Sequence, residues 1–232
     1  MDRIADEELE ATALLAEPVR RTLYLYVLRD GGEVGRDQAA RAIGIERGLA
    51  AFHLDKLADA GLLDVTYRRL SGRSGPGAGR PNKLYRRSAH QIDLTLPERR
   101  YALIAHLLAS AVASSPAATA ALGRAALALG ESIGAGARVA AGRRAGRDAL
   151  MRTAKERLAR MGFEPYHAEG GTIRLRNCPF DALANEHREL ICGANLELID
   201  GVLAGLRATG IVAALEPGAG HCCVALKRPL QA

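Results

Sequence analysis

The chain has 232 residues, of which 48% are hydrophobic and 25% charged, and its formal net charge is +6. This length and composition indicate a globular protein with one large domain or two small ones, each with its own core. Residues 1–10 are acidic and mixed, and no charge-free apolar run reaches the ~18 residues of a membrane span. We therefore expect no signal peptide, no membrane contact and a cytoplasmic location.

Helical periodicity marks three segments in the N-terminal part. Residues 8–30 have one apolar face, and Pro18 suits a first helical turn. Residues 36–43 form a second, shorter helix that Gly44 ends, and residues 46–60 form a third. Two short helices joined by a brief glycine-containing turn are typical of a helix-turn-helix.

A strongly basic hairpin is expected directly after these helices. Residues 65–92 hold no acidic side chain and read as a strand (VTYRRL), a glycine- and proline-rich loop (SGRSGPGAGRP) and a second strand (NKLYRRS). The basic side chains of this segment are Arg68, Arg69, Arg73, Arg80, Lys83, Arg86 and Arg87. They carry +7, so the rest of the chain is close to neutral. A helix-turn-helix followed by a basic wing predicts binding to double-stranded DNA.

The candidate DNA-contacting residues follow from this layout. Arg47 lies in the first turn of the third helix, where recognition helices present side chains to base edges, while Arg36 and Gln38 are placed to meet phosphates. The full set is Arg36, Gln38, Arg47, Ala51, Phe52, His53, Arg68, Arg69, Arg73, Arg80 and Lys83. Alternatives remain for two of them: Arg47 as a solvated surface arginine, and His53 as a residue that caps or packs within the domain.

The middle of the chain, residues 91–147, is expected to be a helical linker or dimerisation region that follows a DNA-binding domain at 1–90. It is Ala-rich and interrupted by glycines, with one apolar stripe at Leu103, Leu107 and Leu108. The alternative to a dimer interface is an ordinary helical linker. We expect a homodimer, because a helix-turn-helix protein usually spans two half-sites.

Residues 148–232 are expected to form a small α+β sensor domain, so that the whole chain is mainly α with an α+β C-terminal part. Its predicted elements are a helix at 148–161, strands at 164–167 and 172–177, a helix at 187–209, and strands at 211–216 and 222–226. All the cysteines lie here: Cys178, Cys192, Cys222 and Cys223. In a reducing compartment such clustering indicates metal or redox chemistry more than structural disulfides.

The order HLDKLADAGLL, basic wing and GRPNKLYRRS resembles winged-helix bacterial repressors of the ArsR/DeoR type, and is most similar to SufR-like repressors of iron–sulfur cluster assembly. The resemblance covers nearly the whole chain. It implies a repressor whose C-terminal cysteines hold an iron–sulfur cluster that controls DNA affinity. Cys178, Cys192 and Cys222 match positions of the family pattern, whereas the remaining position falls near Arg207, where there is no cysteine.

The resemblance therefore implies Cys178, Cys192 and Cys222 as ligands, with a fourth from Cys223, His187, His221 or an exogenous molecule. Cys222 and Cys223 are adjacent in a predicted strand, so their side chains should face opposite sides and only one should join the site. The alternatives are a metal ion, buried structural cysteines or a thiol redox switch.

Two other functions are alternatives to this one. The first is a regulator that binds a small organic ligand and keeps inert cysteines. The second is an enzyme built on the C-terminal part. The chain has no phosphate-binding glycine loop, and its lone His and Asp residues form no recognisable catalytic set, so we expect no enzyme activity.

Overall fold

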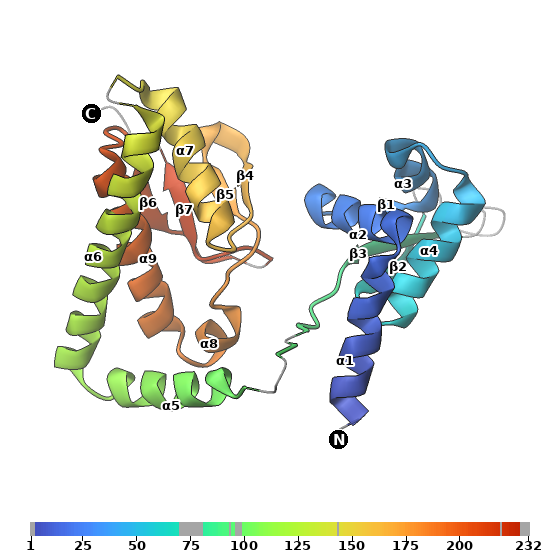
Figure 1. The fold of residues 1–232 in the computed structure, drawn as a ribbon, viewed down its shortest axis with the longest axis horizontal. Coiled ribbons are helices and arrows are strands. Elements are labelled where there is room, and N and C mark those ends of the chain that lie inside the picture. Colours follow the sequence, from blue (N-terminus) through green and yellow to red (C-terminus); the bar gives the residue numbers. More distant parts are fainter. Residues whose placement is uncertain are drawn as a thin grey trace. The chain divides into compact units, whose positions relative to one another are not determined.

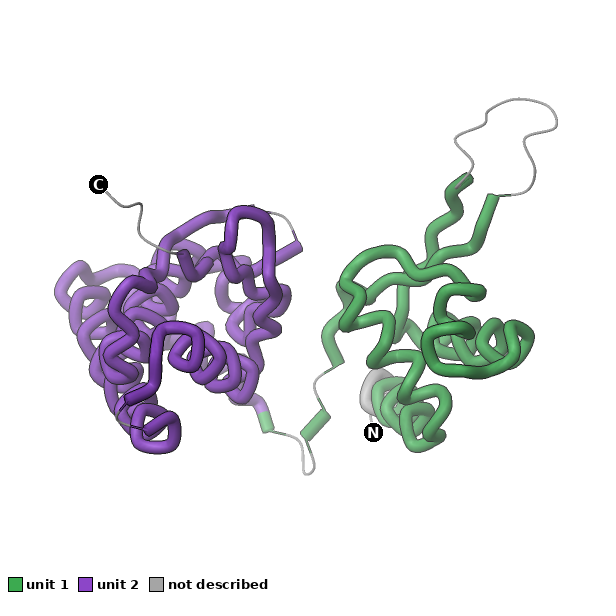
Figure 2. The backbone as a smooth tube through the Cα atoms, turned by 90° about the horizontal axis from the view of Figure 1, so that it is seen from above, with its two compact units in different colours: residues 1–99 green, residues 100–232 purple. Residues whose placement is uncertain are grey.

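The computed structural model describes residues 3–69, 81–92, 94–95, 99–142, 144–218 and 220–227. The chain is mainly helical, with two small antiparallel sheets (Figure 1). It divides into two compact units, residues 1–99 and residues 100–232 (Figure 2).

The first unit begins with two helices where one was predicted. α1 (Arg3–Ala13) and a 3₁₀ turn (Leu14–Ala16) precede α2 (Pro18–Asp30), so the single helix predicted at 8–30 is wrong. Glu17 separates them in an extended conformation, and its carboxylate accepts hydrogen bonds from the backbone N–H groups of Val19 and Arg20 at 3.1 and 2.6 Å. This N-cap starts a new helix, with proline in the first turn where it costs no hydrogen bond.

The next two helices agree with the prediction. α3 (Arg36–Ile43) ends at Gly44, which has φ +71°, and α4 (Arg47–Asp59) follows with Glu46 at its N-cap. A left-handed backbone at Gly44 suits glycine because no Cβ is present to clash. The turn places the N–H of Ile45 on the Ala40 carbonyl at 3.0 Å, which fixes the short connection between the helices.

A three-stranded antiparallel sheet completes this unit. β2 (Leu63–Arg68) and β3 (Asn82–Arg87) form the predicted hairpin, and β1 (Val34–Gly35), which was not predicted, pairs with β3 to give the order β1-β3-β2. A two-residue strand has too short an alternation to be recognised from sequence. The sheet and helices share a core whose fully buried side chains include Leu23, Val27, Leu54, Leu57 and Tyr85.

The second unit combines helices with a four-stranded antiparallel sheet of order β4-β5-β7-β6. Its helices are α5 (Tyr101–Ala113), α6 (Pro116–Ala141), α7 (Arg147–Arg160), α8 (Asp181–Glu186) and α9 (Arg188–Leu206). Its strands are β4 (Pro165–His167), β5 (Ile173–Leu175), β6 (Val212–Leu215) and β7 (Val224–Lys227), with a 3₁₀ turn at Glu169–Gly171. The helices of the predicted middle region, α5 and α6, thus belong to the same compact unit as the cysteine-bearing part.

Backbone-to-backbone packing joins α6 to α9, which lie side by side in Figure 1. Gly130 and Gly134 on α6 face Gly201 and Gly205 on α9, and a Cβ built on Gly130 would come within 2.1 Å of the Leu198 carbonyl oxygen. The glycines inside α6 do not break the helix, which runs for 26 residues and ends at Gly142. The glycines remove the side chains that would otherwise hold the two helices apart.

Other apolar side chains of these helices lie at the surface of the unit. On α5, Leu103, Leu107 and Leu108 are each about 60% exposed. Among the described residues, no single helix is long and apolar enough to cross a membrane; α5 and α6 meet the length and composition criteria only as a pair, and that pair is bent by 119°.

Replacing Gly134 with alanine should lower the free energy of unfolding of the second unit by about 3 kcal/mol or more, because the new Cβ would overlap the Val202 carbonyl oxygen. The matched control is Gly136→Ala on the same helix, where a Cβ meets nothing within 4 Å. That change should stabilise the helix by roughly 0.5–1 kcal/mol. Chemical denaturation of the three proteins measures both effects, and equal stability of the two variants would contradict the packing described.

Candidate functional site

The outer face of α4 presents a mixed cationic and apolar surface. The Arg47 side chain is 64% exposed and pairs with the exposed Asp37 at 2.7 Å, a surface contact that water and salt readily weaken. Phe52 is 53% exposed, although its ring is one that folding usually buries. Leu49 and Lys56 lie beside it at helical spacing, are also exposed, and were missed by the sequence analysis. Leu49 precedes Phe52 by three residues and Lys56 follows it by four, and this spacing could have predicted that the three side chains share one helix face.

Two of the predicted DNA-contacting residues, Arg36 and Lys83, have partners inside the first unit. Arg36 donates to both carboxylate oxygens of Asp55 at 3.0 and 2.8 Å, and Lys83 donates to the same carboxylate at 2.6 Å. The Tyr85 hydroxyl also donates to Asp55 at 2.6 Å. Desolvation opposes ionisation of Asp55, but the hydrogen bonds from Lys83, Tyr85 and Arg36 outweigh it, and the pKa of Asp55 is lowered. This network ties α3, α4 and β3 together.

Gln38 and His53 also face partners within the first unit. The Gln38 amide donates to Asp30 at 3.0 Å and to the Tyr26 hydroxyl at 3.3 Å. His53 is buried, with its Nδ1 3.7 Å from a Glu17 carboxylate oxygen. For His53 the structure thus shows packing within the domain, and Ala51 beside it is half-buried.

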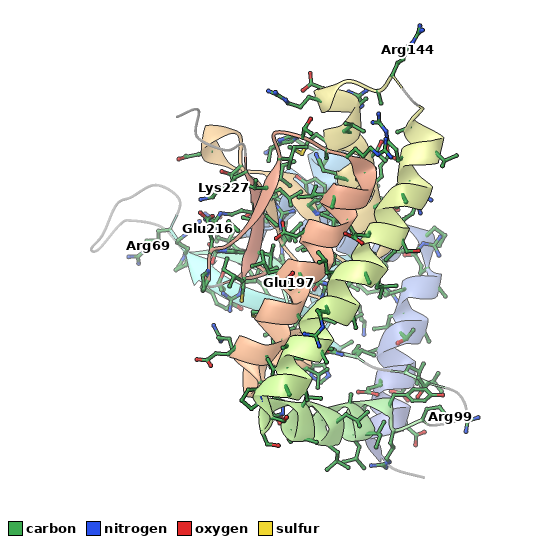
Figure 3. All side chains as sticks on the ribbon, turned by 90° about the vertical axis from the view of Figure 1, so that its left-hand side faces the viewer. Arg69, Arg99, Arg144, Glu197, Glu216 and Lys227 are labelled. Carbon is green, nitrogen blue, oxygen red and sulfur yellow. The ribbon has the colours of Figure 1, made fainter. Side chains whose placement is uncertain are left out.

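The basic hairpin is partly neutralised along its strands. Arg68 pairs with Glu33 at 2.9 Å, and Arg86 pairs with Asp64 at 3.3 Å. Arg69 follows the end of β2 (Figure 3). The two remaining candidates, Arg73 and Arg80, lie outside the described residues.

The four cysteines gather in the second unit from three separate segments. Cys178 follows β5, Cys192 lies in the second turn of α9, and Cys222 and Cys223 precede β7. The sulfurs of Cys192 and Cys223 are 2.9 Å apart. An interaction between the Cys178 and Cys222 thiols shifts the pKa of both, raising that of Cys178 and lowering that of Cys222. The prediction that Cys222 and Cys223 belong to the strand is wrong, and their position before β7 lets each meet a different cysteine.

Hydrogen bonds to Cys222 make it the most acidic of the shifted thiols. Its pKa is lowered to about 7, first because the Cys178 thiol donates to its sulfur, and further by donors from Asn195 and from the backbone of Val224 and Cys223. Donating that hydrogen bond raises the pKa of Cys178. Desolvation, followed by the hydrogen bond to Cys223, raises the pKa of Cys192 to about 12. A sulfur surrounded by donors is suited to the thiolate form that binds metals.

Asn195 is a buried polar residue beside these sulfurs. Its side-chain nitrogen donates to Cys222 at 3.3 Å, whereas its Oδ1 atom has no hydrogen-bond partner among the described residues. A buried polar atom without a partner costs free energy, which a ligand or water that donates to it would recover. Asn195 lies one turn after Cys192 on α9, so both side chains face the same group of thiols.

Surrounding contacts hold the cysteine segments in place. The Cys222 N–H donates to the Leu175 carbonyl at 2.8 Å, and the Glu216 N–H donates to the Cys223 carbonyl at 2.6 Å. The Glu216 carboxylate pairs with Lys227, as Figure 3 shows, and also with Arg174 at 2.9 Å. The loop between β6 and β7 is thereby anchored at both ends.

The proposed histidine ligands face other groups. His221 Nε2 lies 2.6 Å from the Arg174 guanidinium, and His187 Nε2 lies 3.4 Å from the Ser110 hydroxyl. Cys223, in contrast, lies against Cys192. Among the predicted alternatives for a fourth ligand, Cys223 is therefore the one that the geometry brings to the other cysteines.

The spacing of the cysteine sulfurs limits the kind of metal group that they can bind. No three of the cysteine sulfurs lie within 4.8 Å of one another, the spacing that a single ion would need. The 2.9 Å between Cys192 and Cys223 lies between an S–S bond of ~2.0 Å and the ~3.8 Å between two thiolates on one tetrahedral zinc ion with ~2.3 Å bonds. Two pairs of thiols fit a group with more than one metal atom, or a redox-active dithiol.

Comparison with protein-family models, curated proteins and solved structures finds no match to this chain.

Proposed function

We propose that this chain is a DNA-binding transcription regulator whose N-terminal unit is a winged helix-turn-helix. The observation that carries the proposal is the order α2-β1-α3-α4-β2-β3 closed by a sheet of order β1-β3-β2. In this arrangement α3 and α4 are the helix pair, and the basic strands β2 and β3 are the stems of the wing. The exposed surface of α4 then corresponds to the face that a recognition helix presents to the major groove.

Distinct contacts are assigned to the α4 surface. Arg47 can exchange its exposed Asp37 partner for guanine, the base that arginine most often reads. Phe52 offers an apolar ring to a thymine methyl group, and Lys56 supplies a charge for a phosphate. Arg36 and Lys83 contribute instead by holding α3, α4 and β3 together through Asp55.

The proposed assembly is a homodimer, and its proposed interface is the exposed apolar face of α5. Leu103, Leu107 and Leu108 lie together on one helix and are each about 60% exposed. Contiguous apolar surface of this kind usually marks an interaction site. A second copy of the chain would cover it and bring two DNA-binding units to a palindromic operator, as helix-turn-helix dimers require.

The proposed signal is an iron–sulfur cluster held by Cys178, Cys192, Cys222 and Cys223. Ligation by four cysteine thiolates is the usual mode for such clusters, and the two thiol pairs supply two ligands at each end of a two-metal unit. The cluster would supply sensitivity to oxygen and redox state. Hydrogen bonds from Asn195 and the backbone to Cys222 would tune its potential and hold the ligand in place.

A dithiol switch is the second candidate, because the sulfurs of Cys192 and Cys223 are only 2.9 Å apart. Oxidation to a disulfide would release two electrons and two protons to an oxidant such as a peroxide. The hollow between α6 and α7 measures about 130 Å³, below the ~300 Å³ at which ligand sites usually begin, so that hollow is not offered as an effector site.

The DNA-binding proposal is tested by reversing charge on α4. Fluorescence anisotropy with a duplex of random sequence should show that the affinity of the wild-type chain falls as salt rises. The double variant Arg47→Glu, Lys56→Glu should bind at least about tenfold more weakly, and its log–log salt slope should be shallower by ~0.9 for each lost phosphate contact.

The matched control for this experiment is Arg160→Glu, an exposed arginine of α7 in the other unit. It should bind as the wild type does, because it leaves the side chains of the α4 face unchanged. Absence of duplex binding by the wild-type chain at low salt, or equal binding by the double variant, would contradict the proposal.

The cluster proposal predicts that protein purified without oxygen contains iron and acid-labile sulfide and absorbs visible light. Cys223→Ser should lose most of this iron, whereas His221→Ala should keep it, because His221 faces Arg174. Metal analysis and spectroscopy check both outcomes. A colourless protein whose mass shows a Cys192–Cys223 disulfide after mild oxidation would favour the dithiol switch instead.

A further inference from the structure

A second group of metal-ligating side chains lies in the C-terminal unit, with no cysteine in it. His106 lies in α5, Glu186 is the last residue of α8, and His187 joins α8 to α9. One ligand atom from each of the three lies within 4.8 Å of the others. Figure 1 shows α8 beside α5, and these elements are in contact although some seventy residues separate them.

The metal-ligating atoms of this group lie close together but form no well-directed hydrogen bond between His106 and Glu186. His106 Nδ1 is 3.0 Å from the nearer carboxylate oxygen of Glu186, which meets the distance of an ion pair. The same nitrogen is buried from solvent and has no properly directed hydrogen bond among the described residues. The two atoms are close, but the His106 nitrogen is not directed at the carboxylate oxygen. The contact is therefore weak, because the strength of a hydrogen bond depends steeply on its angle. An ion between the two atoms would satisfy both lone pairs.

The second histidine completes the donor set. The rings of His106 and His187 are 6.3 Å apart between centroids and tilted by 48°, so they do not stack. The Ser110 hydroxyl lies 3.4 Å from His187 Nε2 and can orient that ring. His187 precedes Cys192 by five residues, about 7.5 Å along a helix axis, and its ring lies against Ser110 and His106 instead.

Two imidazoles and one carboxylate form a donor set that proteins use for zinc with one coordination position left open. Tetrahedral zinc with bonds of ~2.0–2.1 Å holds its ligand atoms ~3.4 Å apart. Atoms already within 4.8 Å reach that spacing by small side-chain rotations. Glu186 is free to make them, because its side chain is 66% exposed.

We propose that His106, Glu186 and His187 bind one zinc ion that ties α5 to the junction of α8 and α9. α5 is the first helix of the second unit and begins directly after the boundary between the units. It also carries the exposed leucines, so the ion fixes the helix on which that apolar face lies. This site uses nitrogen and oxygen donors, which distinguishes it from the sulfur donors of the cysteine cluster.

The test is titration of the full-length chain with Co²⁺, a spectroscopic substitute for zinc. Binding at this site should give visible ligand-field absorption without a sulfur-to-cobalt charge-transfer band. His106→Ala and His187→Ala should each weaken the absorption-monitored affinity on the order of 100-fold or more. Added Zn²⁺ should displace the cobalt and raise the melting temperature of the wild-type chain.

Two further variants separate loss of the site from loss of folding. Glu186→Gln changes one exposed ligand and should weaken Co²⁺ binding while leaving the circular dichroism of the metal-free chain unchanged. His167→Ala, whose ring contacts Lys155 at the surface of the same unit, should bind as the wild type does.

Each outcome of the cobalt titration either supports the zinc site or overturns it. Cobalt absorption that shows only sulfur ligation, or that persists in both histidine variants, overturns the zinc site and leaves the cysteine proposal intact. No uptake by the wild-type chain identifies the group as a plain histidine–glutamate ion pair and likewise overturns it. Loss of cobalt uptake in the histidine variants, with iron retained in anaerobic protein, supports both sites as separate.

Discussion

The close approach of α6 and α9 is the constraint on which the second unit depends. Four glycines let the two backbones touch, and a Cβ at any of them would lie about 2.1–2.2 Å from a carbonyl oxygen. Cys192 precedes Gly201 by nine residues, or two and a half helical turns, so the two residues lie on opposite faces of α9. The face away from α6 therefore carries Cys192 and Asn195 toward the loop before β7. Fixing one face of α9 against α6 thereby sets the position of the thiols on the other.

Some basic side chains of the first unit pair with acidic groups inside the unit, and others are exposed on its surface. The basic excess of the hairpin predicted many DNA contacts, yet Lys83, Arg68 and Arg86 each have an acidic partner within the unit. A carboxylate that receives several donors is stabilised in its ionised form, so the cations around Asp55 are committed to holding the helices on the sheet. On the α4 face Arg47 and Lys56 are exposed, and the proposal assigns their charge to a polyanion.

Local signals in the sequence predicted much of the first unit, and long-range contacts account for what they missed. Gly44 correctly predicted the end of α3, because a left-handed helix cap depends only on a few neighbouring residues. The packing role of the α6 glycines was not predicted, because periodicity shows which helix face is small but not that a second glycine face will meet it. The cysteine pairs were missed for the same reason: spacing places Cys222 and Cys223 on a strand, whereas tertiary contacts place them before it.

The central claim is that the state of the cysteine site controls the affinity of the first unit for DNA. Anisotropy titration of one anaerobic preparation, before and after chelation of its iron, tests this most directly. The account predicts that affinity for a selected duplex changes by roughly 5–150-fold, the usual range of coupling between sites, and that Cys222→Ser shows no such change. Equal affinity of the iron-loaded and iron-free chains for the same duplex would contradict it.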